Sequence, residues 1–167
     1  MSSEGSRGRL APIASEEFRR ACGRFATGIA VATVLDAQGR PHGLTVNSFS
    51  SVSLAPPLVL ICLGRNVTVI DAFRAAEFFG INVLAAGQRE ISDRFARKGL
   101  DRFANIPWHR GKTGSPLLAG VLASLECAVR QRIPSGDHEI LVGEVLHTHV
   151  SEGAPLLFYA SGYRKLE

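Results

Sequence analysis

Long apolar runs are absent from this chain of 167 residues, since none reaches the roughly 18–20 residues that a membrane-spanning helix needs. The first fifteen residues include basic ones, but no apolar stretch follows them, so we expect no secretory signal. Only three cysteines are present, far apart and without a Cys-x-x-Cys pair, which favours reduced, buried thiols over disulfides or a zinc knuckle. The sequence therefore predicts a cytoplasmic protein without a membrane segment.

Aromatic residues make up only 7% of the chain, and most of them fall in apolar runs. The formal charge of +4 is spread out, whereas nucleic-acid binding would need a basic stripe with stacking aromatics. The motifs GxGxxG, GxSxG and HExxH and a complete P-loop are also missing. His147 and His149 lie two apart on an expected strand, but no third ligand is suggested nearby, so we expect no metal site.

Hydrophobic periodicity divides the chain into a flexible tail at 1–15, rich in Gly, Ser and Arg, and one domain at 16–167. Helices are expected from Ser15 to just before Gly28, at 66–76 and at 88–97, and strands at 29–35, 44–52, 58–63, 78–84, 121–133, 139–150 and 156–160, with a long loop at 99–116. Because helices do not alternate with these strands, the pattern predicts a mainly β, antiparallel barrel, closed or partly closed, with peripheral helices.

Two helix starts are expected to be capped by side chains. Ser15 has the residue type of a cap for the first helix, and Thr68 with Asp71 has the spacing of a capping box for the second.

Residues 43–63 carry the strongest functional signal. Short polar side chains fill the first half of this stretch: Thr45, Asn47, Ser48, Ser50, Ser51 and Ser53. A strand that only had to bury itself would not use so many hydroxyls, whereas a strand lining the pocket of a polar, phosphorylated ligand would. The stretch therefore indicates a small-molecule cofactor site.

Four blocks, in this order and spacing, resemble the short-chain flavin reductases, the reductase components of two-component flavin-dependent monooxygenases. They are Thr27-Gly28, GLTVNSFSSVSLAPPL at 43–58, INVLAAGQREISDRFA at 81–96 and SGDHEILVGEV at 135–145, and the resemblance covers residues 16–164. It implies an FMN-binding split β-barrel with Greek-key connections, commonly a homodimer. It further implies hydride transfer from NADH or NADPH to FMN or FAD, with release of reduced flavin to a partner monooxygenase.

The resemblance also implies roles for individual residues. The flavin contacts would be Thr27, Thr45, Val46, Asn47, Ser48, Ser51, Val52, Ser53, Asn66, Thr68, Gln88, Ser92 and Phe95. The NADH site would use Gly136, Asp137, His138 and Tyr163, with His138 as the catalytic candidate that helps to place the nicotinamide over the flavin and Asp137 orienting it.

Structural roles compete with several of these assignments. Asn66 and Thr68 lie where free helix amides favour a phosphate, with Arg65 next to them, but they also suit plain helix caps, as do Gln88 and Ser92. Phe95 suits core packing equally well.

Other functions stay open at this point. The same barrel could hold FMN tightly and oxidise an amine such as pyridoxamine phosphate, although the Gly-Asp-His block at 136–138 speaks against it. A non-catalytic flavin- or haem-binding module and a nucleic-acid-binding barrel are further alternatives. The choices between FMN and FAD, and between NADH and NADPH, are also open.

Overall fold

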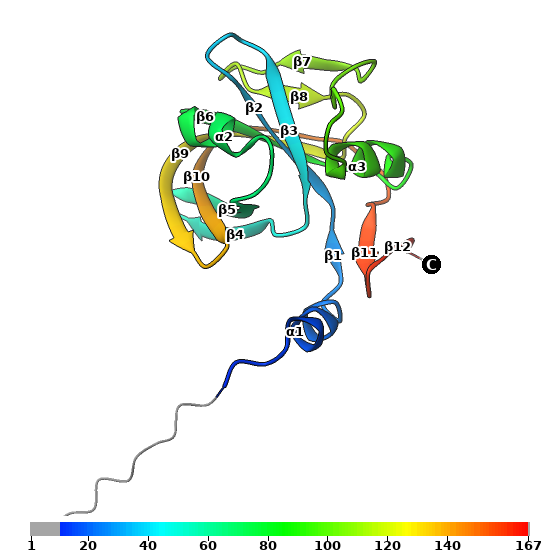
Figure 1. Cartoon of the computed structure of the whole chain (residues 1–167). Helices are drawn as coiled ribbons and strands as arrows, with labels where there is room; N and C mark the ends of the chain where they lie inside the picture. The colour runs from blue at the N-terminus through cyan, green and yellow to red at the C-terminus, as the bar shows by residue number, and fades with distance from the viewer. Residues whose placement is uncertain (1–10, 167) are drawn as a thin grey trace, which may run out of the picture.

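A computed structural model describes residues 11–166, so most of the expected tail lies outside the described residues. Within them, three short helices surround strands that pair only in antiparallel fashion (Figure 1). The prediction of a mainly β, antiparallel fold with peripheral helices is confirmed. In this part of the chain, no helix has the length and apolar character needed to cross a bilayer.

The main sheet has seven strands in the order β3-β2-β6-β9-β10-β5-β4. Their bounds are β2 Ala30–Leu35, β3 Pro41–Val46, β4 Ser50–Leu54, β5 Pro57–Gly64, β6 Phe78–Val83, β9 Ala123–Ser135 and β10 His138–Val150. The strands β3 and β4 follow each other in the sequence but form the two opposite edges of the sheet. The edge strand β3 also contacts β5, which lies next to the other edge. The sheet therefore curls into a barrel that stays open between these edges, as the split-barrel prediction requires (Figure 1). The connection from β5 to β6 passes over the intervening strands β10 and β9, in the manner of a Greek key, whereas β3 continues into β4 through three residues only.

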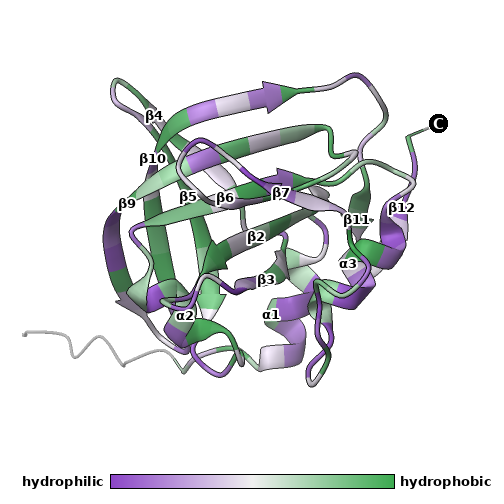
Figure 2. Cartoon of the chain, turned by 90° about the horizontal axis from the view of Figure 1, so that it is seen from above, coloured by the Kyte–Doolittle hydropathy of each residue, from purple (hydrophilic) through white to green (hydrophobic). Residues whose placement is uncertain are grey.

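Smaller elements lie around this barrel. A second sheet joins β1 (Thr27–Gly28), β11 (Leu157–Tyr159) and β12 (Gly162–Arg164), and β7 (Trp108–Arg110) pairs with β8 (Pro116–Leu118). The helices are α1 (Ser15–Cys22), α2 (Ile70–Ala75) and α3 (Arg89–Ala96). Both β8 and α3 contact the strand β2. Figure 2 shows that β2, β5 and β6 carry mostly hydrophobic residues, whereas α1 and α3 also carry hydrophilic ones.

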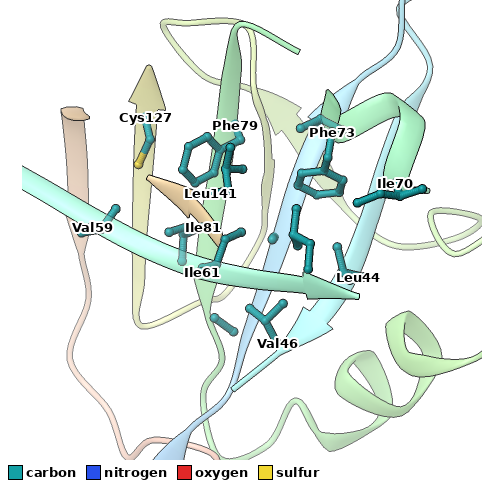
Figure 3. Packing of buried hydrophobic residues seen from close by; sticks show 14 residues of the cluster. Leu44, Val46, Val59, Ile61, Ile70, Phe73, Phe79, Ile81, Cys127 and Leu141 are labelled. Carbon is teal, nitrogen blue, oxygen red and sulfur yellow. The ribbon is translucent and has the colours of Figure 1, made fainter. Parts of the chain in front are cut away.

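The core fills the inside of the curled sheet. Figure 3 shows Phe73 of α2 pointing toward the same interior as Leu44 of β3 and Ile61 of β5, and all three side chains are buried. Burying one such side chain contributes about 1.5–3 kcal/mol. Burial of Phe73 and Ile70 therefore stabilises α2, because a helix of six residues is not stable by its own backbone hydrogen bonds.

Several local expectations are wrong. The strand expected at 44–52 is two strands, β3 and β4, interrupted at residues 47–49. The capping box is absent, because α2 begins at Ile70 after Val69 and no side chain caps it. Ser15 is the first helical residue of α1 rather than its cap, since Ala14 takes the cap position without a side-chain hydrogen bond.

Two further expectations also need correction. The loop expected at 99–116 contains the strand β7, whose partner β8 follows at once. The cysteines are free, but only Cys127 is buried, while Cys62 is half-buried and Cys22 is exposed on α1. Burial raises the pKa of Cys127 to about 12, which keeps that thiol protonated.

A buried carboxylate ties β9 to the turn between β7 and β8. Glu126 is only 5% exposed and accepts hydrogen bonds from the backbone N–H groups of Lys112 (3.0 Å) and Thr113 (2.6 Å) and from Thr113 Oγ1 (2.7 Å). Burial by itself raises the pKa of Glu126, but the hydrogen bonds from Thr113 and Lys112 outweigh burial, so the pKa lies below its ordinary value. The charged carboxylate therefore stabilises the turn.

We expect Glu126→Gln to lower the free energy of unfolding by about 1–3 kcal/mol, because a neutral amide cannot satisfy three donors as a carboxylate does. Urea unfolding at pH 7 measures this loss. The control is Glu144→Gln, which breaks only an exposed ion pair with Arg130 and should cost less than about 1 kcal/mol. Since the folded pKa of Glu126 is lowered, its stabilisation is present above the unfolded pKa and is lost as the pH falls through the folded pKa. Equal losses in the two variants at pH 7 would contradict this role.

Candidate functional site

The opening of the barrel is crossed by residues 47–49, and one side chain fastens this crossing. Ser48 Oγ donates to the carbonyl of Cys62 (3.2 Å) and accepts from the N–H of Cys62 (2.9 Å). The Ser48 hydroxyl thereby takes the place of a strand partner for β5. Asn47 beside it is exposed and faces no such constraint.

The strand β4 presents a free edge next to this crossing. It pairs with β5 on one side only, and the ladder is irregular between Ser51 and Ser53, which leaves Val52 without a partner residue and 51% exposed. Ser51 is exposed and Ser53 is half-buried. Backbone N–H and C=O groups on an open edge remain available to a ligand, and small side chains let a flat ring approach them.

A second cluster joins β3, α3 and β12. Thr45 Oγ1 donates to the carbonyl of Ser92 (2.6 Å), and Tyr163 Oη donates to Asp93 Oδ1 (2.7 Å) and lies 2.9 Å from Ser92 Oγ. The guanidinium of Arg89 stacks over the Tyr163 ring, 4.9 Å from its centre. Burial raises the pKa of Tyr163, so the phenol stays neutral. The resemblance assigns Tyr163 to the NADH site and Thr45 and Ser92 to the flavin site. In the structure these three residues lie in one cluster.

Three further expected flavin contacts, besides Thr45, Ser48 and Ser92, have side chains engaged inside the protein. Gln88 Oε1 accepts from the N–H of Ala85 (2.9 Å), and its Nε2 donates to the carbonyl of Ala119 (3.0 Å). The side chain therefore connects two loops and does not cap α3. Phe95 is fully buried, with its ring edge-to-face on Phe103. Val46 points into the core (Figure 3), which leaves only its backbone for a ligand.

The turn between β9 and β10 carries the Gly-Asp-His block. Gly136 has a φ of 60°, a conformation that favours glycine. His138 pairs with Gly64 across the ladder, and the carbonyl of Asp137 accepts from the N–H of Arg65 (3.0 Å). The block thus lies against the start of the loop that contains Asn66 and Thr68.

Asp137 holds the His138 ring in a fixed orientation. Its Oδ1 lies 2.6 Å from His138 Nδ1, and this contact lowers the pKa of Asp137. With the carboxylate charged, Nδ1 carries a proton and donates it, which leaves Nε2 free as an acceptor when the ring is neutral. Gly64 has no side chain to cover Nε2, since a Cβ there would stand 3.8 Å away. The half-exposed ring can therefore meet a ligand.

Asn66 and Thr68 are both exposed, in the loop that leads from β5 to α2. The helix starts only at Ile70, so neither residue caps it. Thr27 on β1 differs from them, because its Oγ1 is the one buried side-chain polar atom in residues 11–166 that has no hydrogen-bond partner. Such an atom costs stability unless a ligand or water reaches it, which fits a flavin contact.

Several of the expected residues thus form two separate groups. Asp137 and His138 adjoin the loop of Asn66, and Thr45 and Ser92 adjoin Tyr163; within the described chain no hydrogen bond joins Tyr163 to His138. Sequence reasoning missed Asp93, Arg89 and the backbone of Cys62. Asp93 could have been predicted because it follows Ser92 in the sequence, but no local pattern indicates a role for Cys62.

We expect Ser48→Ala to lower the free energy of unfolding by about 1–2 kcal/mol, because it leaves the N–H and C=O of Cys62 unpaired at the opening. Hydrogen exchange of the Cys62 amide should also become faster. The matched control is Ser50→Ala on β4, whose exposed hydroxyl bonds only to the neighbouring Ser51 carbonyl and which should change stability by less than about 0.5 kcal/mol. Unchanged exchange at Cys62 in the first variant would show that Ser48 does not fasten the crossing.

Comparisons with known proteins give relatives that cover most of this chain. Stachydrine N-demethylase reductase subunit Stc3 of Rhizobium meliloti is 44% identical over 145 residues, which are 87% of this chain and 63% of that protein. The FMN reductase (NADH) SmoA of Agrobacterium fabrum is 42% identical over 149 residues, 89% of this chain and 84% of that protein.

Among solved structures, the Streptomyces globisporus NADH:FAD oxidoreductase SgcE6 in complex with NAD and FAD fragments superposes with a TM-score of 0.86 at 37% identity. The match covers 94% of this chain and 98% of that chain. The chain spans only about half to two thirds of the length of the first curated relatives it matches.

A family description also fits nearly the whole chain. Residues 22–167 match the model of the flavin reductase like domain, a range that contains every candidate residue discussed above. The chain belongs to the flavin reductase like domain family.

Proposed function

We propose that this protein is an NAD(P)H-dependent flavin reductase that releases reduced flavin to a partner monooxygenase. The observation that carries the proposal is the free edge of β4 at the opening of the barrel, with the Asp137–His138 pair presented at the end of the neighbouring strand pair. The names of SmoA and SgcE6 support NADH as donor and a flavin as acceptor. Another relative, from Rhodococcus opacus, is named the reductase component of a 4-nitrophenol monooxygenase, which supports the oxygenase partner.

The reaction needs two ligands held face to face. The nicotinamide gives up a hydride, and the flavin takes up this hydride and one proton from water, so that NAD(P)⁺ and reduced flavin leave. The protein has to align the two rings at a short distance and to keep other molecules from reacting with them. No side chain has to act as an acid or base in the hydride transfer itself.

The flavin would lie along β4. Backbone groups of Ser51, Val52 and Ser53 would meet the polar edge of its ring, while the crossing at Asn47 and Ser48 fixes the position of that strand. The Oγ1 of Thr27, which has no partner in the described residues, offers one more hydrogen bond. Asn66 and Thr68, both exposed, would face the phosphate.

The nicotinamide would be placed by His138. Its carboxamide carries an N–H donor, which the free Nε2 can accept, while Asp137 keeps the imidazole in the matching tautomer. Gly64 leaves room for this approach. The pair thus acts on the position of the nicotinamide and not on the electrons that move.

We further propose a cytoplasmic homodimer. The three free cysteines agree with a reducing compartment. The helix α1 buries no residue in this chain, and Phe18 and Phe25, at and just beyond it, are 56% and 77% exposed. Large aromatic side chains in such a position favour cover by a second copy.

The first test mixes the purified protein with NADH or NADPH and with FMN or FAD, and follows absorbance at 340 nm. We expect flavin-dependent loss of NADH or NADPH and protein that purifies with little bound flavin. Tightly bound yellow flavin without turnover of either nicotinamide would instead favour an FMN-retaining oxidase. No turnover and no flavin binding would reject a flavin role altogether.

A second test replaces His138 with Ala. Loss of the Nε2 acceptor should raise the apparent KM for NADH, or lower kcat, about tenfold, which corresponds to about 1.4 kcal/mol. Flavin affinity, measured by fluorescence quenching, should stay within about twofold of the wild type. The matched control is His149→Ala, an exposed histidine at the other end of β10 that bonds only to Ser151. If flavin affinity fell while NADH kinetics were unchanged, the assignment of His138 to the nicotinamide would be wrong.

A further inference from the structure

A cavity of about 470 Å³ lies beside the proposed flavin phosphate position and outside the residues assigned so far, apart from Thr68. It opens where the start of β3, the loop before α2 and the segment after α3 meet, and Figure 1 shows β3 between the two helices. Its lining consists of Arg40, Pro41, His42, Gly43, Thr68, Val69 and residues 100–104.

The most unusual group in this lining is the guanidinium of Arg102. The residue is only 8% exposed, its Nη1 donates to the carbonyl of Gly43 (2.7 Å) and its Nε donates to the carbonyl of Arg97 (2.9 Å). No carboxylate pairs with it in residues 11–166, and burial lowers its pKa below the ordinary value without removing the charge. A buried cation without a counter-ion is costly unless an anion completes it.

One nitrogen of Arg102 remains available for such an anion. Nη2 makes no hydrogen bond. In the described chain, Thr27 Oγ1 is the only side-chain polar atom that is both fully covered and without a partner, so Nη2 is not fully covered. Since Arg102 lines the cavity, we infer that Nη2 faces it. The two carbonyl contacts fix the plane of the guanidinium, so little side-chain entropy is lost when an anion binds.

The remaining walls have the character of a nucleotide site. Arg40 and His42 stand on the β3 side, both held by Asp36, whose Oδ2 lies 2.9 Å from Arg40 Nε and 2.9 Å from His42 Nε2. Val69, Leu100 and Phe103 supply an apolar wall on which a purine can lie. One acid, Asp101, also lines the cavity, and its carboxylate already accepts from the N–H of Phe103 (3.1 Å).

The size of the cavity separates a nucleotide from a simple ion. Its volume lies within the roughly 300–1,000 Å³ of small-molecule sites, which is far more than a single phosphate group fills. Thr68 borders both the cavity and the proposed place of the flavin phosphate. A flavin ligand that is longer than FMN would place the part beyond that phosphate in this cavity.

We propose that this cavity binds the adenylate half of a dinucleotide, with its phosphate at Arg102 Nη2, and that this dinucleotide is FAD. The inference rests on the proposed reductase function. The same adenylate occurs in NADH and NADPH, so the tests below distinguish the two sources. Thr68 favours the flavin, because it lines this cavity, whereas Asp137 and His138, which we assign to the nicotinamide, do not.

The test compares FAD and FMN in steady-state reduction by NADH. Leu100→Glu places a negative charge on the exposed rim of the cavity, and we expect KM for FAD to rise about tenfold while KM for FMN changes less than twofold. Arg102→Lys keeps the charge but loses the planar fork, and we expect the same direction of change in KM for FAD. The matched control is Arg130→Gln, a surface arginine paired with Glu144, which should leave both values unchanged.

AMP alone serves as the second probe. In the wild type it should compete with FAD but not with FMN or NADH, and Leu100→Glu should abolish the inhibition. Competition with NADH, lost in Leu100→Glu, would assign the cavity to the nicotinamide dinucleotide and overturn the FAD assignment. Equal changes of KM for FAD and FMN, or no inhibition by AMP, would overturn the adenylate site itself. Failure of the wild type to reduce either flavin would reject the reductase function instead, so the two failures are distinguishable.

Discussion

The contact between Ser48 Oγ and the backbone of Cys62 is the constraint on which the candidate site depends. The chain has to cross the opening of the barrel between β3 and β4, and no strand pairing is available there. One hydroxyl satisfies both backbone groups of Cys62 and thereby fastens the crossing to β5. The edge of β4 can then stay open to a ligand while the chain beside it remains fixed to β5.

An open edge also sets how tightly a flavin can bind. Backbone groups that face water exchange hydrogen bonds with water for hydrogen bonds with the ligand, so each contributes only about 0.5–1.5 kcal/mol. Binding through such groups at Ser51, Val52 and Ser53 suits a flavin that arrives oxidised and leaves reduced. A buried pocket closed on all sides would hold the product and slow its transfer to an oxygenase. The geometry of the opening therefore agrees with a diffusible flavin.

The sequence predicted most of the strands because apolar alternation and turn residues are local signals, and residues 57–64 and 78–83 fall where expected. It failed where distant contacts decide the local structure. The Thr68–Asp71 spacing predicts a cap, but the loop before α2 is held instead by Asp137, through its carbonyl at Arg65. Arg102 was invisible for the same reason, since its partner Gly43 lies 59 residues away and is a carbonyl without a sequence signature. Thr27 and His138 were assigned to the site only because the resemblance pointed to them.

The position of His138 follows from the same curvature that closes the core. The β9–β10 ladder shifts register between Val142 and Gly143 and again between Val145 and His147, and such irregularities bend a strand pair. At Gly143 the ring of Phe79 occupies the space that a side chain would take, so the bend and the core packing require each other. Because β10 pairs with β5 in one register, the bend delivers His138 over Gly64; a slip by one residue would turn its ring to the other face. Packing inside the barrel and placement of the proposed nicotinamide contact are therefore set by one feature of the backbone.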